Sequence, residues 1–280
     1  MLLILKDIHS LKKQLRSWHD KNITLVPTMG SLHQGHLYLV EQACKHGGRV
    51  IVSIFINPTQ FAPKEDFSQY PRDLARDLEL LSPYPIDAVF TPEATELFSP
   101  SYQSFVENTE LARALCGISR PNFFRGVCTV VLKLFLLTNC NTAIFGKKDY
   151  QQLKIIEQMI KDFHLDVKIL SQQIIREKNG LAMSSRNAYL NAEQKKHASY
   201  IYKGLLAARK LYEEGEINGE AIRKQAHEII CMHQKLEIEY LELRQQSDLS
   251  LIESLVNTPA VLLTAVRFAG VRLIDNIEMD

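Results

Sequence analysis

Short apolar runs alternate with amphipathic segments along the first half of the chain. The runs Ile23–Val26 and Val50–Ile56 flank a segment, Ser31–His46, whose apolar positions recur at helical spacing and which ends at Gly47-Gly48. A continuous apolar run is typical of a strand buried on both faces. The pattern therefore predicts a strand–helix–strand unit with parallel strands and a right-handed crossover.

The same alternation continues to about Ile175. We expect helices at Arg72–Leu81, Val127–Leu137 and Tyr150–Phe163, and strands at Asp87–Phe90, Ala143–Phe145, Leu165–Leu170 and near Ile174-Ile175. Repeated alternation of this kind predicts an α/β fold with a doubly wound, Rossmann-like parallel sheet.

The pattern changes after Ile175. Two helical segments come first, and three strand-like runs follow, the last two separated by a tight turn at Ala269-Gly270. The sequence therefore predicts a Rossmann-like domain over residues 1–175 and a smaller α+β domain over 176–280. No long Pro/Gly/Ser linker separates them, so we expect close packing with a cleft between them. The expected elements of the second domain are Ala192–Glu214, Gly219–His233, Leu236–Leu243, Ala260–Phe268 and Val271–Ile277.

Composition narrows the class of protein. The chain has 280 residues, of which 46% are hydrophobic and 23% charged, as in ordinary globular proteins. Lys and Arg number 33 against 32 Asp and Glu, which argues against a nucleic-acid partner. No apolar run approaches the ~20 residues of a membrane span. The five cysteines are scattered without a C-x-x-C pair, so we expect free thiols and a cytoplasmic location.

The segment from Thr28 to His36 is the strongest candidate for chemistry. It follows the first predicted strand and carries His33 and His36 three residues apart, hence on one face of a first helical turn. That turn presents unpaired N–H groups and the positive end of the helix dipole, which suit a phosphate. Gly35 leaves room for a flat ring against the backbone. The alternative is a capped helix with two surface histidines, but the position directly after a strand favours the phosphate site.

Three further polar clusters follow predicted strands, at Asn57–Gln60, Gly146–Gln152 and Leu181–Asn187. Ligands of such sheets bind at the carboxyl ends of the strands. Lys148 and Arg186 can neutralise phosphate charge, and Asp149 can accept hydrogen bonds from ribose hydroxyls. The remaining polar side chains are Ser184 and Ser185, which can donate to phosphate, and Gln60 and Gln152, which suit a small hydroxylated substrate.

Each of these residues also has a structural explanation. Lys147-Lys148 could be solvated, Ser184-Ser185 could cap the following segment, and Asn57-Pro58 could form only a turn. Gln60 could be a loop residue and Gln152 a surface residue at a helix start. A serine or cysteine nucleophile is not favoured because the sequence lacks a G-x-S-x-G elbow. No H-E-x-x-H or EF-hand pattern is present either.

The pair of motifs at His33–His36 and Met183–Arg186 resembles the two signatures of the nucleotidylyl-transferring superfamily that includes class I aminoacyl-tRNA synthetases. More specifically, the chain resembles the pantoate–β-alanine ligase family. The matching segments run in order along nearly the whole chain: Val26–Gly30, Leu32-His33, Gly35-His36, Val52–Pro58, Gln60-Phe61, Tyr70–Arg72, Phe124–Val127, Thr129–Val131, Lys148–Gln152, Met183–Asn187 and Arg272–Asn276.

The resemblance implies a two-step reaction. The pantoate carboxylate attacks the α-phosphate of ATP to give pantoyl adenylate and pyrophosphate, and the amine of β-alanine then displaces AMP. Mg²⁺ is implied only as a companion of the ATP phosphates, without a metal site made by the protein. The resemblance also implies a homodimer. The place of Ser184–Arg186 at the leading edge of the second domain leads us to expect that this domain closes over the nucleotide. From the charge balance and the apolar runs we expect no nucleic-acid or membrane partner.

The resemblance also carries roles for individual residues. His36 is implied as the proton donor, with His33, Lys148 and Arg186 as the other catalytic groups. Pantoate and β-alanine are assigned to Gln60, Gln152 and Asn57. The implied ATP site consists of Met29, Gly30, His33, Gly35, His36, Gly146, Lys147, Lys148, Asp149, Ile175, Met183, Ser184, Ser185 and Arg186.

Two positions depart from the family's pattern. Lys147 stands where the family often has a glutamate, and Phe123 stands where it often has a histidine.

Other readings of the sequence are a nucleotidyltransferase that leaves AMP on its product, a truncated synthetase, or a non-catalytic nucleotide-binding module. The presence of His33, His36 and Lys148 argues against the last of these.

Overall fold

The computed structural model describes residues 2–19, 22–62, 65–233 and 235–279. The chain forms two compact units. The first unit comprises Met1–Lys147 and Ile155–Gln173, and the second comprises Lys148–Lys154 and Ile174–Asp280. The short piece Lys148–Lys154 thus belongs with the C-terminal part of the chain, although it precedes the last strand and most of the last helix of the first unit.

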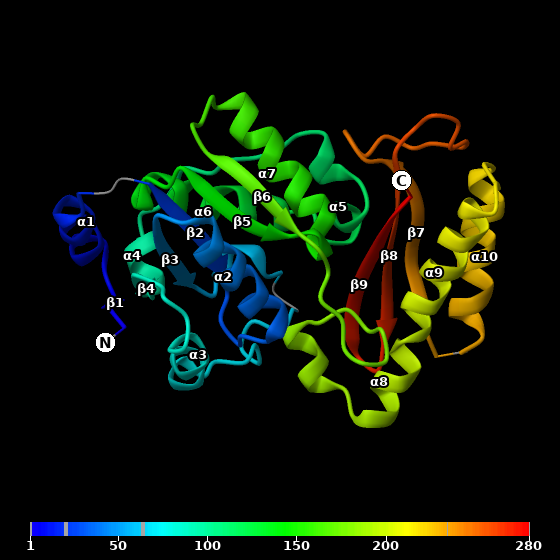
Figure 1. Ribbon diagram of the computed structural model, residues 1–280, viewed down its shortest axis with the longest axis horizontal. Helices are drawn as coiled ribbons and strands as arrows, with labels where there is room; N and C mark the ends of the chain where they lie inside the picture. The colour runs from blue at the N-terminus through cyan, green and yellow to red at the C-terminus, as the bar shows by residue number, and fades with distance from the viewer. Residues whose placement is uncertain (1, 20–21, 63–64, 234, 280) are drawn as a thin grey trace. The chain divides into compact units, whose positions relative to one another are not determined.

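A six-stranded parallel sheet forms the centre of the first unit (Figure 1). Its order is β1-β4-β3-β2-β5-β6. Strands β3 and β4 are added on one side of β2, and β5 and β6 on the other, so the order in which strands are added reverses between β2 and β5. In open α/β sheets the crevice at such a reversal is the usual ligand site. The strands are β1 (Ile4–Leu5), β2 (Ile23–Thr28), β3 (Arg49–Ile54), β4 (Ala88–Phe90), β5 (Thr142–Gly146) and β6 (Lys168–Gln172).

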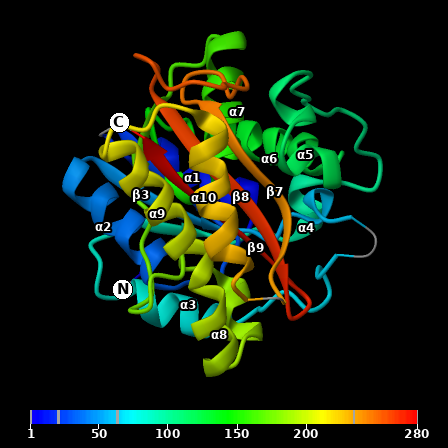
Figure 2. The ribbon, with the colours of Figure 1, turned by 90° about the vertical axis from the view of Figure 1, so that its right-hand side faces the viewer.

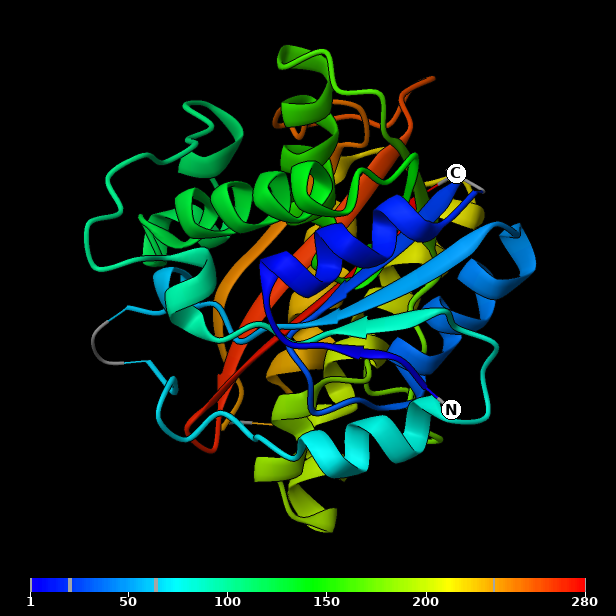
Figure 3. The same ribbon diagram turned by 90° about the vertical axis from the view of Figure 1, so that its left-hand side faces the viewer.

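Helices cover this sheet. The helix α2 (Gln34–His46) packs through Leu37, Val40 and Ala43 against buried valines of the central strands, and α3 (Leu74–Leu81) adds Leu81 to the same cluster. On the other face α1 (Ile8–Ser17) lies beside the long apolar helix α6 (Phe123–Thr138) (Figure 3). The remaining long helix that contributes to this unit is α7 (Tyr150–Asp162). The predicted doubly wound α/β fold is confirmed.

The second unit is an antiparallel sheet with two long helices. Its strands β7 (Glu237–Gln245), β8 (Ala260–Phe268) and β9 (Val271–Met279) pair in chain order. The helices α9 (Tyr200–Glu213) and α10 (Gly219–Cys231) lie side by side across one face of this sheet (Figure 2). The turn at Ala269-Gly270 has positive φ at both residues, 49° and 76°, as a type I′ two-residue hairpin requires.

Most predicted elements are present with small shifts at their ends, but two expectations are wrong. No strand forms at Ile174-Ile175, because the edge strand β6 already ends at Gln172. The expected helix Ala192–Glu214 is broken at Ser199 into α8 (Ala192–Ala198) and α9. The hydroxyl of Ser199 donates to the carbonyl of Lys196 (2.7 Å), a local hydrogen bond that favours a helix end.

Several short elements complete the description. The strand β1 and the helix α1 precede Ile23, where no element was expected. Among the described residues, no helix has the length and apolar character needed to cross a membrane. The other helical turns are η1 (Pro58–Gln60), α4 (Ala94–Leu97), η2 (Leu111–Arg113), α5 (Cys116–Ser119), η3 (Lys147–Asp149) and η4 (Ser185–Tyr189).

Candidate active site

The loop after β2 carries the two histidines. The chain leaves Thr28 and passes through Gly30 and Ser31, whose φ values of 75° and 50° are both left-handed. The helix α2 then begins at Gln34, three residues later than expected, with His33 as its N-cap. The histidines therefore occupy the cap and the third helical position of a helix that starts at the sheet reversal.

The histidines cap the helix reciprocally. The N–H of Gly35 donates to Nδ1 of His33 (3.1 Å), and the N–H of His33 donates to Nδ1 of His36 (3.4 Å). The two rings are stacked with centroids 4.0 Å apart. Because each Nδ1 accepts a backbone hydrogen bond, the proton of each neutral imidazole belongs on Nε2. Both side chains are thus held as Nε2–H donors.

This arrangement suits an anion. Imidazole N–H groups at a helix N-terminus add directional donors to the backbone N–H groups and the positive dipole end already there. A phosphate oxygen that gains charge in a reaction would be stabilised by donors already oriented toward it. The capping part of the alternative is present, since both histidines serve the cap of α2, and both residues are half-buried.

Gln60 lies in a buried turn of the same unit. It is 7% exposed and sits at the end of η1, with its Nε2 donating to the sulfur of Met29 (2.7 Å). Asn57 is 1% exposed, and its amide donates to Oε1 of Gln60 (3.1 Å) and to the carbonyl of Gly126 (3.0 Å). Asn57-Pro58 therefore forms more than a turn, because the Asn57 amide fixes the orientation of the Gln60 side chain.

Gly126 and Arg120 contact the Asn57–Gln60 turn and support it. A Cβ at Gly126 would lie 2.5 Å from the carbonyl oxygen of Thr59, so only glycine permits this approach of α6. Arg120 donates to the carbonyl of Gln60 (3.2 Å) and pairs with both carboxylate oxygens of Glu65. Its guanidinium lies 3.6 Å from the ring centroid of Phe123. Phe123, which departs from the family pattern, therefore stacks on the arginine that holds Gln60.

In the second unit, Lys148 is mostly shielded from solvent. Its side chain is 20% exposed, with Nζ 3.8 Å from the carboxylate of Asp149, whose side chain is 47% exposed. The amide of Asn276 donates to the carbonyl of Lys148 (3.0 Å). Lys148 is thus not a freely solvated lysine, because most of its side chain is shielded from water. Strand β9 in addition fixes its backbone.

The segment Met183–Arg186 is a short turn held at both ends. Ser184 is the N-cap of η4 and accepts from the N–H of Arg186 (3.3 Å), so the expected capping alternative is confirmed for this serine. Asn187 is buried and donates to the carboxylate of Glu177 (2.8 Å), which also accepts from Lys195. Met183 donates through its N–H to the carbonyl of Ile175 (2.9 Å). A capping serine still has a hydroxyl able to contact a ligand.

A buried ion pair connects Lys148 with the loop that precedes Met183 in the second unit. Arg176 binds both carboxylate oxygens of Asp275, at 2.6 and 3.0 Å, and donates to the carbonyl of Gly180 (3.1 Å). Asp275 also accepts the N–H of Asn276, whose amide holds Lys148. Burial raises the pKa of the Asp275 carboxyl, and the guanidinium of Arg176 opposes that rise. One carboxylate therefore anchors both the Lys148 backbone and the 176–182 loop.

The sequence-predicted residues divide between the units as follows. The structure brings Met29 and Gln60 into contact, His33 and His36 into contact, and Lys148 beside Asp149. Gln152 lies half-buried in the first turn of α7. The first unit contains Met29, Gly30, His33, Gly35, His36, Asn57, Gln60, Gly146 and Lys147, and the second contains Lys148, Asp149, Gln152, Ile175, Met183, Ser184, Ser185 and Arg186.

The sequence did not reveal the residues that support the candidate site residues through hydrogen bonds and close packing. These residues contact partners that are distant in sequence, and such contacts leave no periodic pattern in the sequence. They are Arg120, Gly126, Arg176 and Asp275. Gly126, Asp275 and Asn276 do lie in segments that match the family, and that match was the only available signal. Asp77, which binds the loop before His33, lies outside those segments.

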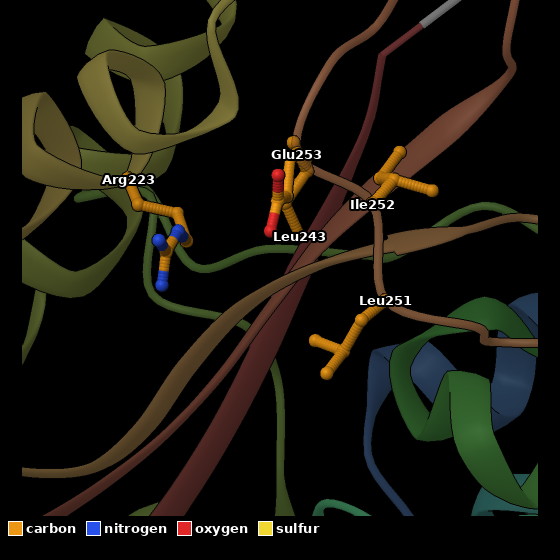
Figure 4. A pocket seen from close by; sticks show the side chains of 5 residues that line it. All are labelled: Arg223, Leu243, Leu251, Ile252 and Glu253. Atoms are coloured by element: carbon orange, nitrogen blue, oxygen red, sulfur yellow. The ribbon is translucent and has the colours of Figure 1, made fainter.

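Outside this site, the described residues contain no metal-binding cluster but do form a small pocket. In the described ranges, no group of three or more His, Cys, Asp or Glu side chains could hold a metal ion. A small pocket of about 190 Å³ opens in the second unit, lined by Arg223, Leu243, Leu251, Ile252 and Glu253 (Figure 4). None of its lining residues belongs to the candidate site.

The fold and the histidine motif define a nucleotide-binding α/β enzyme of the nucleotidylyl-transferring superfamily. The chain belongs to the pantoate–β-alanine ligase family, whose model matches residues 3–278. The family activity is the ATP-dependent condensation of pantoate with β-alanine, and the chain is an enzyme with this activity.

The chain is similar to curated and solved proteins over almost its full length. It is 44% identical over 276 residues to the pantothenate synthetase of Thermosipho africanus, covering 98% of this chain and 99% of that one. A pantothenate synthetase structure from Thermus thermophilus matches with a TM-score of 0.95 at 37% identity, covering 99% of both chains. The ligase of Francisella tularensis, solved with "Beta-gamma ATP and Beta-alanine", matches with a TM-score of 0.81 at 32% identity, covering 99% of this chain and 97% of that one.

Proposed function

We propose that this chain condenses pantoate with β-alanine through a pantoyl adenylate formed at the turn that carries His33 and His36. The observation that carries the proposal is the reciprocal cap, which holds both imidazoles as Nε2–H donors at a helix N-terminus. A carboxylate is a poor acyl donor, and adenylation turns it into an acyl group with AMP as the leaving group.

In the first step a pantoate carboxylate oxygen bonds to the α-phosphorus, and the bond from that phosphorus to the bridging oxygen of pyrophosphate breaks. Negative charge gathers on the phosphate oxygens as this happens. Donors fixed in advance are the main catalytic resource for such a step. His33 and His36 donate to these oxygens, while Lys148 and Arg186 neutralise the charge that leaves with pyrophosphate.

In the second step the neutral amine of β-alanine attacks the acyl carbon, and the bond from that carbon to the AMP oxygen breaks. The amine gives one proton to water as the amide forms, and AMP leaves with the bonding electron pair as the phosphate monoester. No protein nucleophile takes part. The half-buried rings of His33 and His36 continue to donate to the phosphate of the departing AMP.

Gln60 and Gln152 bind pantoate in this proposal, with Gln60 also near β-alanine. A buried amide whose orientation is fixed by Asn57 suits a ligand that carries both hydroxyl and carboxylate groups. Asn57 therefore acts through Gln60. The ATP contacts proposed for the other residues are backbone and ring contacts by Met29, Gly30, Gly35, Gly146, Ile175 and Met183, phosphate contacts by Lys147, Ser184 and Ser185, and ribose contacts by Asp149.

We propose that Mg²⁺ arrives with ATP as part of the substrate. Mg²⁺ prefers oxygen ligands and keeps several waters, so phosphate oxygens can hold it with few protein ligands. A homodimer, a cytoplasmic location, the absence of a nucleic-acid partner, and closure of a 176–280 domain over the nucleotide bound by a 1–175 domain stay predictions. Light scattering tests the first, and structures with and without ATP test the last.

One assay tests the proposed route. Purified protein receives ATP, Mg²⁺, pantoate and β-alanine, and AMP is followed over time. We expect AMP to form in step with pantothenate, and to form poorly when another hydroxy acid replaces pantoate. AMP that forms with a different acid but not with pantoate would contradict the substrate assignment, and ADP in place of AMP would contradict the adenylate.

Lys148→Ala should lower kcat/KM for ATP about 10–100-fold, the range for losing one charged hydrogen bond. Lys224→Ala is the control, because it removes the same charge from an exposed side chain of the second unit. We expect its effect to stay below about 3-fold, since an exposed charge contributes little. Steady-state kinetics with varied ATP distinguish the two. Equal losses in both variants would mean that the net charge of the unit matters but the position of Lys148 does not.

Gln60→Ala and Gln152→Ala should each raise KM for pantoate about 3–10-fold, the range for one neutral hydrogen bond, and leave KM for ATP nearly unchanged. The exposed Gln103→Ala provides a control for the loss of an amide elsewhere in the first unit. Pantoate saturation curves give the answer. An unchanged KM for pantoate in both variants would remove the glutamines from substrate recognition.

A further inference from the structure

Asp77 is a buried carboxylate that the proposed mechanism does not use. It lies in α3 and is 2% exposed. Its Oδ2 accepts from the N–H of Ser31 (2.9 Å), and its Oδ1 accepts from the N–H of Leu32 (2.7 Å). Both oxygens thus bind the backbone of the turn that ends at His33.

That turn needs such support. Gly30 and Ser31 both have left-handed φ values, which cost free energy for a residue such as serine. A Cβ at Gly30 would lie 2.9 Å from Oδ2 of Asp77 and 3.0 Å from Cγ2 of Ile54. The carboxylate therefore occupies the space that a side chain at position 30 would need, and glycine allows the close approach.

Burying this carboxylate costs free energy. Burial raises the pKa of Asp77 above its ordinary value, and the two N–H groups only partly oppose that rise. Because its folded-state pKa lies above the unfolded one, Asp77 contributes most stability at low pH and loses that contribution as the pH rises through the folded-state pKa. The helix does not need it as a cap, since Asp73 is the N-cap of α3.

We propose that Asp77 is a positioning residue for the adenylation step, whose carboxylate fixes the Gly30–Leu32 turn so that His33 and His36 present their Nε2–H groups to the phosphate. The inference rests on the roles proposed above for the two histidines. Asp77 touches neither substrate nor reacting atoms, and it acts only through the backbone that leads into the cap of α2.

Asp77→Asn tests the requirement for two acceptors. An asparagine offers one acceptor oxygen and turns an NH₂ group toward the other backbone N–H, so the turn must shift. Misplacing catalytic groups by about 1 Å can cost on the order of 100-fold in rate. We expect pantoate-dependent exchange of pyrophosphate into ATP to fall about 10–100-fold on that basis. KM for β-alanine in the full reaction should stay unchanged.

Asp73→Asn is the matched control. It removes the same charge from the same helix, and asparagine caps a helix as well as aspartate does. We expect its exchange rate to stay within about 2-fold of the parent, as for an exposed charge. Rates are expressed per active site, counted by the burst of pyrophosphate in a single turnover. A rate loss in Asp77→Asn that disappears on this basis would reduce Asp77 to a folding role and overturn the proposal.

A double-mutant cycle with His36→Gln separates this proposal from the function on which it rests. If Asp77 acts through the histidine turn, Asp77→Asn should cost at most about 3-fold once His36 is replaced, because coupled residues are not additive. Full multiplication of the two effects would overturn the positioning role. A normal exchange rate in His36→Gln would instead overturn the histidine assignment and the Asp77 inference with it. A slow His36→Gln beside a normal Asp77→Asn would overturn the Asp77 inference alone.

Discussion

His36→Gln should lower the rate of adenylation about 10²–10³-fold, as expected when one donor to a developing phosphate charge is lost. Glutamine at the third helical position can still accept from the N–H of the cap residue, as in an ordinary capping box. The imidazole is therefore removed while the helix start is kept. His36→Ala should lose as much rate, and its melting temperature should fall because it also loses the capping contact.

The control is His46→Gln, which changes an exposed histidine at the other end of α2. We expect nearly parental kinetics from it. Pyrophosphate exchange in the presence of pantoate measures the first step without β-alanine, and thermal melting verifies the fold. A folded His36→Gln protein with an unchanged exchange rate would remove His36 from the chemistry.

Arg176→Met should lower the free energy of unfolding by about 3–5 kcal/mol, because it leaves the buried carboxylate of Asp275 without its partner. The variant also loses the hydrogen bond to Gly180 and the stacking of the guanidinium on Tyr202, whose ring centroid is 3.6 Å away. Since Asp275 anchors Asn276, and Asn276 holds the carbonyl of Lys148, we further expect a raised KM for ATP.

The loss of stability in Arg176→Met should change with pH in a direction that follows from the pKa of Asp275. Burial raises the pKa of Asp275 and Arg176 lowers it, so the rise is larger without Arg176. A carboxyl whose folded-state pKa is raised stabilises the fold below its unfolded pKa and loses that effect as the pH rises. The stability deficit of Arg176→Met should therefore be smaller at acid pH than at neutral pH, as measured by urea unfolding.

Arg209→Met is the control for this experiment. Arg209 pairs with Glu213 one helical turn away, and both side chains are about half exposed. Such pairs contribute about 0.3–0.5 kcal/mol. If Arg176→Met cost no more than Arg209→Met, the buried pair would not be the anchor of the second unit. If the deficit grew toward acid pH, the carboxylate would not be its cause.

The fold was largely predictable because its strands are buried on both faces. The runs at 23–26 and 50–56 are apolar for that reason, and their alternation with amphipathic helices is the sequence pattern of a doubly wound sheet. The failures have local causes. Ile174-Ile175 is as apolar as a strand but has no pairing partner, and the break at Ser199 depends on a hydroxyl that binds a nearby carbonyl.

The site was predictable only where its residues lie close together in sequence. His33 and His36 belong to one helical turn, so their spacing carries their geometry, although not the acceptor state of each Nδ1. The supporting contacts join distant residues, 46 positions apart for Asp77 and Ser31 and 99 for Arg176 and Asp275. No local pattern encodes such pairs, and only the folded chain brings them together.

Oxygen transfer tests the adenylate most directly. Pantoate labelled with ¹⁸O in its carboxylate is incubated with ATP, Mg²⁺, β-alanine and the protein, and the products are examined by ³¹P NMR. The adenylate route predicts that AMP carries one ¹⁸O atom in its phosphate, because the carboxylate oxygen that attacks phosphorus leaves with AMP. AMP without the label, or label found in inorganic phosphate beside ADP, would contradict it.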